Sequence, residues 1–175
     1  MIVAAAVAAV VVAAGLYWFQ PWKLWQDQTV SEALPTAAPS TPAADPTSAA
    51  PTESVPPAPQ TVARGSLISH EHTTTGTAKI VRLPDGSHTL RLEGLDTSNG
   101  PDLRVWLTDA PVKEGTAGWH VFDDGKYVSL GKLKGNKGDQ NYPIPADVKL
   151  SEYTSVSIWC DRFDVSFGAA RLTAA

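Results

Sequence analysis

The chain has 175 residues and a formal net charge of -4. Basic and acidic residues nearly balance from Arg64 onward, so the sequence provides no positive field that would gather nucleic acid, and we exclude a nucleic-acid partner. Cys160 is the single cysteine, which excludes an intramolecular disulfide and a cysteine-rich zinc module. A folded part of this chain must therefore be stabilised by a hydrophobic core.

Residues 1–25 are predicted to form a transmembrane anchor. The uninterrupted apolar run from Ile2 to Phe19 is long enough, at about 1.5 Å per residue, to cross a hydrocarbon core of about 30 Å. Aromatic residues and Lys23 follow it, as is typical where a helix leaves a bilayer. The alternative is a cleaved secretory signal, but no basic segment precedes the run and bulky side chains follow it. We predict a single-pass cell-membrane protein whose C-terminal domain is extracytoplasmic.

Residues 26–63 are predicted to be a disordered linker. They are rich in proline, alanine, threonine and serine and contain almost no large apolar residue, so they cannot form a core. Their many prolines disfavour both helices and sheet interiors. This composition predicts a partly polyproline-II stalk that extends up to roughly 100 Å at about 3.1 Å per residue.

Residues 64–175 have the pattern of an all-β domain. Short runs of β-branched, leucine and aromatic residues are separated by glycine, proline, asparagine and aspartate. One predicted hairpin joins strands at 77–83 and 88–93 through a turn at 84–87. Residues 110–127 are expected to be an irregular excursion. About eight strands over this length predict an antiparallel, jelly-roll-like β-sandwich.

The segment 155–170 contains Cys160. From Val156 the apolar residues alternate with serines, which is the period of a half-buried strand. The alternation changes phase by Phe163, so a bulge or a tight turn must absorb one residue between Cys160 and Arg162. Cys160 is therefore predicted at a strand corner near an end of the sheet.

Two interpretations of Cys160 stay open at this point. A lone cysteine on the buried phase of a strand is commonly a small packed hydrophobe. An unpaired cysteine in an oxidising compartment is also a candidate redox thiol, and Arg162 would lower its pKa if the two side chains point the same way. The sequence identifies no cofactor, and whether the protein is an enzyme stays open.

His70 and His72 form a candidate metal site. Residues two apart on a strand face the same way, so both imidazoles would reach one metal ion, and with Cys160 they would make a ligand set suited to copper. Nothing in the sequence shows that the two segments meet. A solvated strand face explains the histidine pair equally well.

Several short motifs of the domain occur in a characteristic order. They are Ser69-His70-Glu71-His72, Asn99-Gly100-Pro101-Asp102-Leu103, Gly131-Lys132-Leu133-Lys134-Gly135, Asn141-Tyr142-Pro143-Ile144-Pro145, Trp159-Cys160-Asp161-Arg162-Phe163 and Phe167-Gly168-Ala169-Ala170. In this order they resemble the DM-thirteen (electron transfer) domain family in its membrane-anchored bacterial type. The resemblance covers roughly Gly65 to Leu172.

The resemblance implies an extracellular or membrane-anchored protein, of a family sometimes found beside haem-binding DOMON modules. The redox cysteine proposed for the family corresponds to Cys160, whereas the resemblance implies no ligand role for His70 or His72. Since we expect no DOMON module here, the electron partner would be another extracytoplasmic protein. We predict a membrane-tethered domain with a redox or electron-transfer role centred on Cys160. The alternative is a non-enzymatic binding or adhesion module in which the cysteine is structural.

Overall fold

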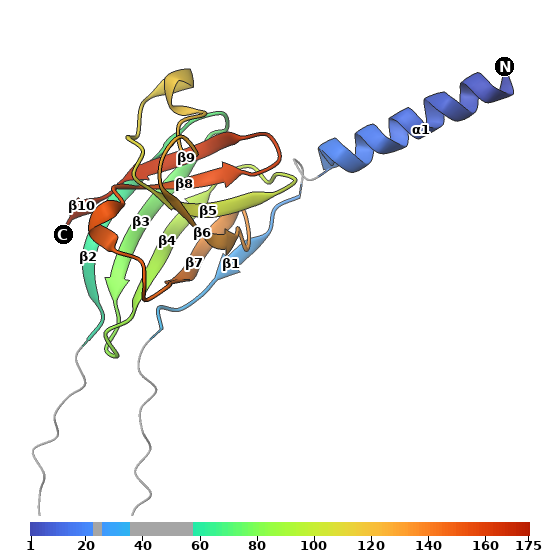
Figure 1. Cartoon of the computed structure of the whole chain (residues 1–175). Coiled ribbons are helices and arrows are strands. Elements are labelled where there is room, and N and C mark those ends of the chain that lie inside the picture. The colour runs from blue at the N-terminus through green and yellow to red at the C-terminus, as the bar shows by residue number, and fades with distance from the viewer. Residues whose placement is uncertain (23–25, 36–57) are drawn as a thin grey trace, which may run out of the picture.

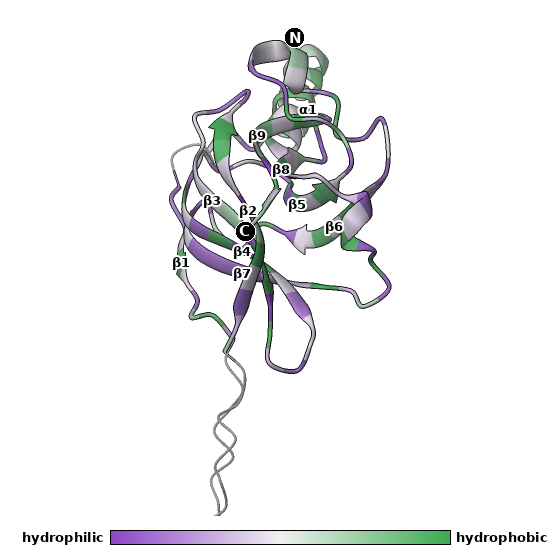
Figure 2. Cartoon of the chain, turned by 90° about the vertical axis from the view of Figure 1, so that its left-hand side faces the viewer, coloured by the Kyte–Doolittle hydropathy of each residue, from purple (hydrophilic) through white to green (hydrophobic). Residues whose placement is uncertain are grey.

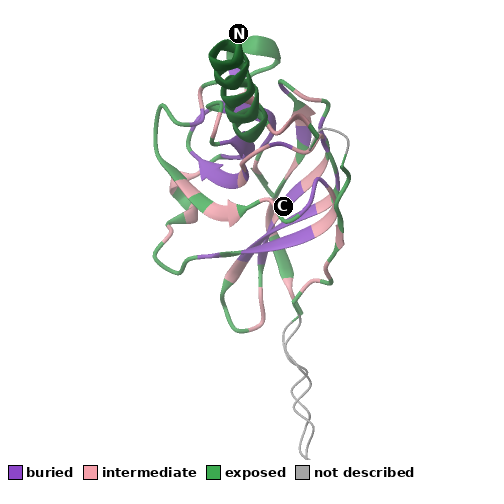
Figure 3. Ribbon diagram, turned by 90° about the vertical axis from the view of Figure 1, so that its right-hand side faces the viewer, coloured by how far each residue is buried: buried purple, intermediate pink, exposed green. Residues whose placement is uncertain are grey.

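The computed structural model describes residues 1–22, 26–35 and 58–175. One helix, α1 (Ile2–Phe19), precedes a β domain (Figure 1). The helix is apolar (Figure 2), and none of its residues is buried inside the protein (Figure 3). It is long and apolar enough to cross a membrane, and a signal sequence near an N-terminus has the same properties.

The strands of the described residues form one curled, mixed sheet. They are β1 (Thr29–Ser31), β2 (Gln60–Ser69), β3 (Thr75–Arg82), β4 (His88–Asp96), β5 (Leu103–Thr108), β6 (Tyr127–Lys132), β7 (Lys137–Ile144), β8 (Ser155–Cys160), β9 (Val165–Arg171) and β10 (Thr173–Ala174). Their order is β1-β7-β4-β3-β2-β9-β8-β5-β6, with β10 paired to β2. Short 3-10 helices lie at Gly115–Gly118 and Leu150–Glu152. The all-β prediction is confirmed.

The sheet folds over at β2. The first part of β2 pairs with β3, and its last three residues, 67–69, pair with β9. Gly65 lies just before this change of partner, where a Cβ atom would lie 2.0 Å from the carbonyl oxygen of Arg171. The two halves of the sheet face one core, to which Leu92 and Ile158 belong from opposite halves. This is the sandwich-like packing that the number of strands predicts.

Both turns predicted from local sequence are present. The β3–β4 turn uses Gly86 at a φ of 84°, and the Asp85 carboxylate accepts a hydrogen bond of 2.9 Å from the backbone of Ser87. Residues 161–164 form a tight turn between β8 and β9, with Asp164 at a φ of 51°. This turn absorbs the phase change after Cys160.

The prediction that β8 is half-buried is wrong, because every residue of β8 is buried. Val156 and Ile158 pack in the inner core between the two halves of the sheet. On the other face, Trp159 packs with Phe122 in a second cluster. The irregular residues 110–126 cover this face of β8. Their sequence has no hydrophobic periodicity that would predict this burial.

Residues 26–35 lie against the domain, although the sequence places them in the linker. β1 pairs in parallel with β7, the one parallel pair among the described strands, and β2 begins at Gln60. Strands therefore extend into both ends of the predicted 26–63 segment. Strands can form in this segment without an apolar sequence pattern, because backbone pairing and ionic contacts hold them. The prediction of an extended tether concerns mainly residues 36–57, which lie outside the described residues.

Candidate functional site

Cys160 ends β8, and its side chain has no exposed surface. It belongs to the inner core. Burial raises the pKa of the Cys160 thiol, and hydrogen bonding by the backbone of Arg162, Phe163 and Asp102 opposes this shift. The thiol is therefore protonated and shielded at neutral pH in this conformation.

The side chain of Arg162 is turned toward α1. Its Nη1 donates a hydrogen bond of 2.6 Å to the backbone oxygen of Trp18, and its guanidinium carbon lies 5.1 Å from the centre of the Trp18 ring. Arg162 acts on the pKa of the Cys160 thiol through its backbone. Tuning by the guanidinium would require a different side-chain orientation.

His70 takes part in a buried chain of hydrogen bonds. Its Nε2 lies 3.0 Å from the carbonyl oxygen of Lys113, and its Nδ1 lies 2.8 Å from Oγ of Ser166. A carbonyl oxygen only accepts, so Nε2 carries the proton and Nδ1 accepts from Ser166. Ser157 then donates to Ser166 over 3.0 Å. Burial lowers the pKa of His70, which favours the neutral imidazole that this chain requires.

The structure does not bring His70 and His72 to one face. Both residues follow the end of β2, where strand periodicity no longer applies. His70 contacts Ser166, whereas the ring of His72 lies 3.9 Å from that of Phe167. Ser166 and Phe167 are consecutive in β9 and point to opposite faces. Among the described residues, no three His, Cys, Asp or Glu side chains are grouped to hold a metal ion.

A stack of aromatic rings crosses the outer face of β6, β5 and β8. The ring centres of Tyr127 and Trp106 are 4.1 Å apart, and those of Trp106 and Trp159 are 4.9 Å apart. Tyr127 is 46% exposed, whereas both tryptophans are buried. The stack therefore leads from the surface to the residue that precedes Cys160. Sequence reasoning missed it, because its members are distant in the chain.

The Phe-Gly-Ala-Ala motif is explained by close packing. A Cβ atom at Gly168 would lie 2.6 Å from Cβ of Thr74, so a larger residue cannot fit. Oγ1 of Thr74 lies 3.0 Å from the backbone oxygen of Phe167, which ties the bend after β2 to β9. Ala169 and Ala170 are fully buried on opposite faces of β9. This part of the motif is structural.

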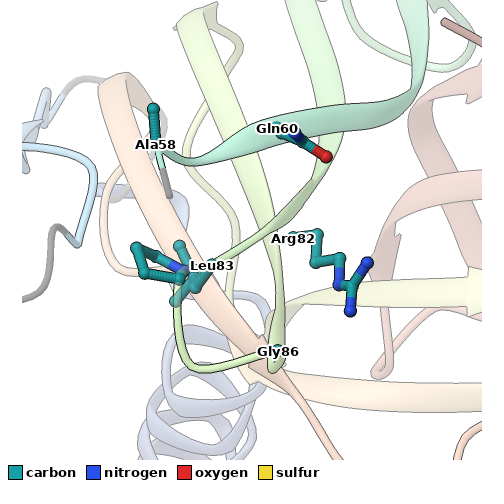
Figure 4. A pocket seen from close by; sticks show the side chains of 6 residues that line it. Ala58, Gln60, Arg82, Leu83 and Gly86 are labelled. Atoms are coloured by element: carbon teal, nitrogen blue, oxygen red, sulfur yellow. The ribbon is translucent and has the colours of Figure 1, made fainter. Parts of the chain in front are cut away.

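A pocket of about 180 Å³ lies at the β3–β4 turn (Figure 4). Its lining consists of Ala58, Gln60, Arg82, Leu83, Pro84 and Gly86. Arg82 is the one ionisable residue in this lining, which offers no paired acid, base or nucleophile. The pocket is therefore a poor candidate for a catalytic site.

Fold and site together define an all-β domain with one buried, unpaired cysteine, preceded by an apolar helix. A family model described as Electron transfer DM13 matches residues 66–172. This match covers more than half of the chain, and the protein belongs to the Electron transfer DM13 family. Neither a curated protein nor a solved structure matches it. The resemblance found in the sequence is confirmed.

Proposed function

We propose that this protein is a membrane-anchored, extracytoplasmic electron-transfer domain whose redox centre is Cys160. Membership of the electron-transfer family is the observation that carries this proposal. The apolar helix α1 supports anchoring in the cell membrane. Arg162 and its neighbours in the β8–β9 turn tune the thiol through their backbone. The redox partner is a separate extracytoplasmic protein.

The chemistry open to a single thiol is limited. With no second cysteine to resolve it, the Cys160 thiolate attacks a disulfide of a partner protein, so that a mixed disulfide forms and the partner's other sulfur leaves as a thiolate. Since the thiol is buried and its pKa is raised, this reaction requires the turn 161–164 to open. The closed turn then protects the resting thiol against oxidation.

The second candidate is a non-enzymatic binding or adhesion module in which Cys160 is structural. The complete burial of the side chain and the raised pKa of the thiol favour this function. The two candidates differ in whether the native thiol exchanges with a disulfide.

The decisive experiment uses the full chain in detergent or nanodiscs. A glutathione redox buffer is applied to the native protein, the mixed disulfide is measured by mass, and the Cys160→Ala variant serves as the control. If Cys160 is the redox centre, we expect native protein to be glutathionylated reversibly and at a higher rate than that of global unfolding. Modification that occurs only on unfolding supports the structural candidate and contradicts the redox one.

Metal content and visible absorbance are measured on the same samples. A metal ion that survives Cys160→Ser but is lost in His70→Ala would show that the thiol is the wrong centre. His70 and His72 are not part of our proposal as joint ligands, because they contact side chains on opposite faces of β9.

A further inference from the structure

Residues 26–33, which we call the strap, bind along the edge of the sheet. In Figure 1 the strap lies beside β7, where Val30 pairs with Gly138 at the middle of β1. The backbone N–H of Lys137 donates to the oxygen of Gln28 over 3.2 Å, and that of Glu32 donates to Asp139 over 3.0 Å. The strap thus adds a strand to the domain.

Ionic contacts fix both ends of the strap. The Glu32 carboxylate accepts from Nζ of Lys134 over 2.7 Å and from the backbone of Asn141 over 2.7 Å. These bonds lower the pKa of Glu32. Asp27 accepts from Asn136 over 2.8 Å and lies 3.1 Å from Nζ of Lys137. Lys134 in the turn after β6 and Lys137 at the start of β7 therefore bind acidic residues of the same chain.

Two glycines leave room for the strap. A Cβ atom at Gly135 would lie 2.3 Å from the backbone oxygen of Gln28. Gly138, at a φ of 93°, would place a Cβ atom 2.0 Å from the backbone oxygen of Val30. Since both positions exclude a side chain, this edge of the domain is shaped to receive the strap.

The strap limits how far the domain can lie from α1. The helix ends at Phe19, and Gln26 is already held by a 3.3 Å hydrogen bond from Asn99. The seven Cα–Cα steps from Phe19 to Gln26 span at most about 25 Å when fully extended. A stalk of roughly 100 Å between membrane and domain is incompatible with this attachment.

The β8–β9 turn lies beside the end of α1. Arg162 donates to the backbone oxygen of Trp18, a favourable place for a cation at a helix C-terminus. The ring of Phe163 stacks on that of Phe19 with centres 5.7 Å apart, and Phe163 is 37% exposed. The turn thus extends the aromatic end of the helix.

The described residues that flank 36–57 lie at the opposite end of the domain. β7 runs from Lys137 beside the strap to Ile144, which pairs with His88 at the β3–β4 turn. Pro35 and Ala58 flank the undescribed residues, and both line pockets to which Leu83 of that turn contributes. The chain therefore leaves β1 and re-enters β2 at the end of the domain away from α1.

From these contacts we infer that the domain sits directly on the membrane surface, with the β8–β9 turn in the lipid headgroup interface. The partner of this surface is the bilayer itself, because aromatic and basic side chains beside the end of a membrane helix favour the lipid headgroup interface. Pro35 and Ala58, which flank residues 36–57, then lie at the membrane-distal end of the domain. A redox partner of Cys160 must approach along the membrane. This inference rests on the anchoring part of the proposed function.

The test uses the full chain in phosphatidylcholine vesicles. In a Cys160→Ala background, a fluorophore is attached either to Phe163→Cys in the β8–β9 turn or to Ser87→Cys in the β3–β4 turn. Lipids brominated near the headgroup are expected to quench the label at 163 and to leave the label at 87 bright. Equal quenching at both positions, or none at 163 in chains that float with the vesicles, overturns the inference.

The strap is tested by charge reversal. Asp27→Lys with Glu32→Lys places like charges opposite Lys134 and Lys137, so quenching at 163 should be lost. Adding Lys134→Glu and Lys137→Glu should restore it. Quenching that persists in the first variant refutes the role of the strap. A chain that does not float with vesicles refutes the anchor, and with it the inference, whatever its thiol chemistry.

Discussion

The two faces of β8 belong to two different cores. The inner core, which contains Cys160 and Ile158, is mostly aliphatic and joins the two halves of the sheet. The outer cluster contains Trp106 and Trp159 and is covered by residues 110–126. The inner face of β8 is packed by apolar side chains, Val156 and Ile158 among them, whereas the outer face is also held by hydrogen bonds among buried serine and histidine side chains.

This difference places the buried hydrogen bonds between serine and histidine side chains and the candidate thiol on opposite sides of one strand. The thiol lies in the apolar inner core, so a substitution that removes little volume, such as Cys160→Ala, is expected to be tolerated. The outer face must satisfy its buried polar groups, so a single lost partner is costly. Stability measurements on the two faces can therefore separate structure from redox chemistry.

The largest effect is expected for Trp159→Ala. This side chain is 1% exposed and packs against Trp106 and Phe122. Its removal should lower the free energy of unfolding by about 3–5 kcal/mol. Urea denaturation of the full chain in detergent measures this, with Tyr127→Ala at the exposed end of the stack as the milder control. Equal losses in the two variants would show that the outer cluster is not a second core.

The next effect is expected for Ser166→Ala, which leaves Nδ1 of His70 and the Ser157 hydroxyl without their shared partner. Each buried unsatisfied group costs about 1–3 kcal/mol. The matched control is Ser129→Ala, which removes an exposed hydroxyl. If the two serine variants unfold at the same urea concentration, the chain of hydrogen bonds does not stabilise the outer face.

A pH dependence should follow from His70. Burial lowers its pKa in the folded protein below the ordinary value of 6.5, so below that pH the unfolded chain binds the proton more readily. Stability should therefore fall as pH drops below 6.5, and His70→Gln should weaken this dependence. Thermal unfolding between pH 5 and pH 7 measures it. An unchanged slope in the variant would assign the effect to another group.

The smallest effect is expected for Cys160→Ala on the inner face. Loss of one sulfur atom compares with the removal of a methyl group, which costs about 0.5–1.5 kcal/mol. The variant should thus fold, and a loss of thiol exchange in it would report chemistry rather than instability. A cost as large as that of Trp159→Ala would instead make the thiol a principal element of the core.

Local sequence patterns account for much of the fold. The length and composition of α1, the strand runs, the β3–β4 turn and the phase change after Cys160 all depend on residues close together in the chain. The ordered motifs were sufficient to identify the family. These features are predictable because hydrophobic periodicity and turn chemistry act within a few residues.

The tertiary structure decided what lies beside Cys160. Burial of the outer face of β8 depends on residues 110–126, whose sequence has no strand periodicity. The placement of the strap depends on contacts such as that of Asn136 with Asp27, which are 109 residues apart in the chain. The orientations of Arg162 and His70 likewise depend on segments that meet only after folding. The sequence by itself determined an apolar helix, a β domain and its family. Only the folded chain decided that the cysteine is enclosed and that the domain is held near the helix, because both result from long-range packing.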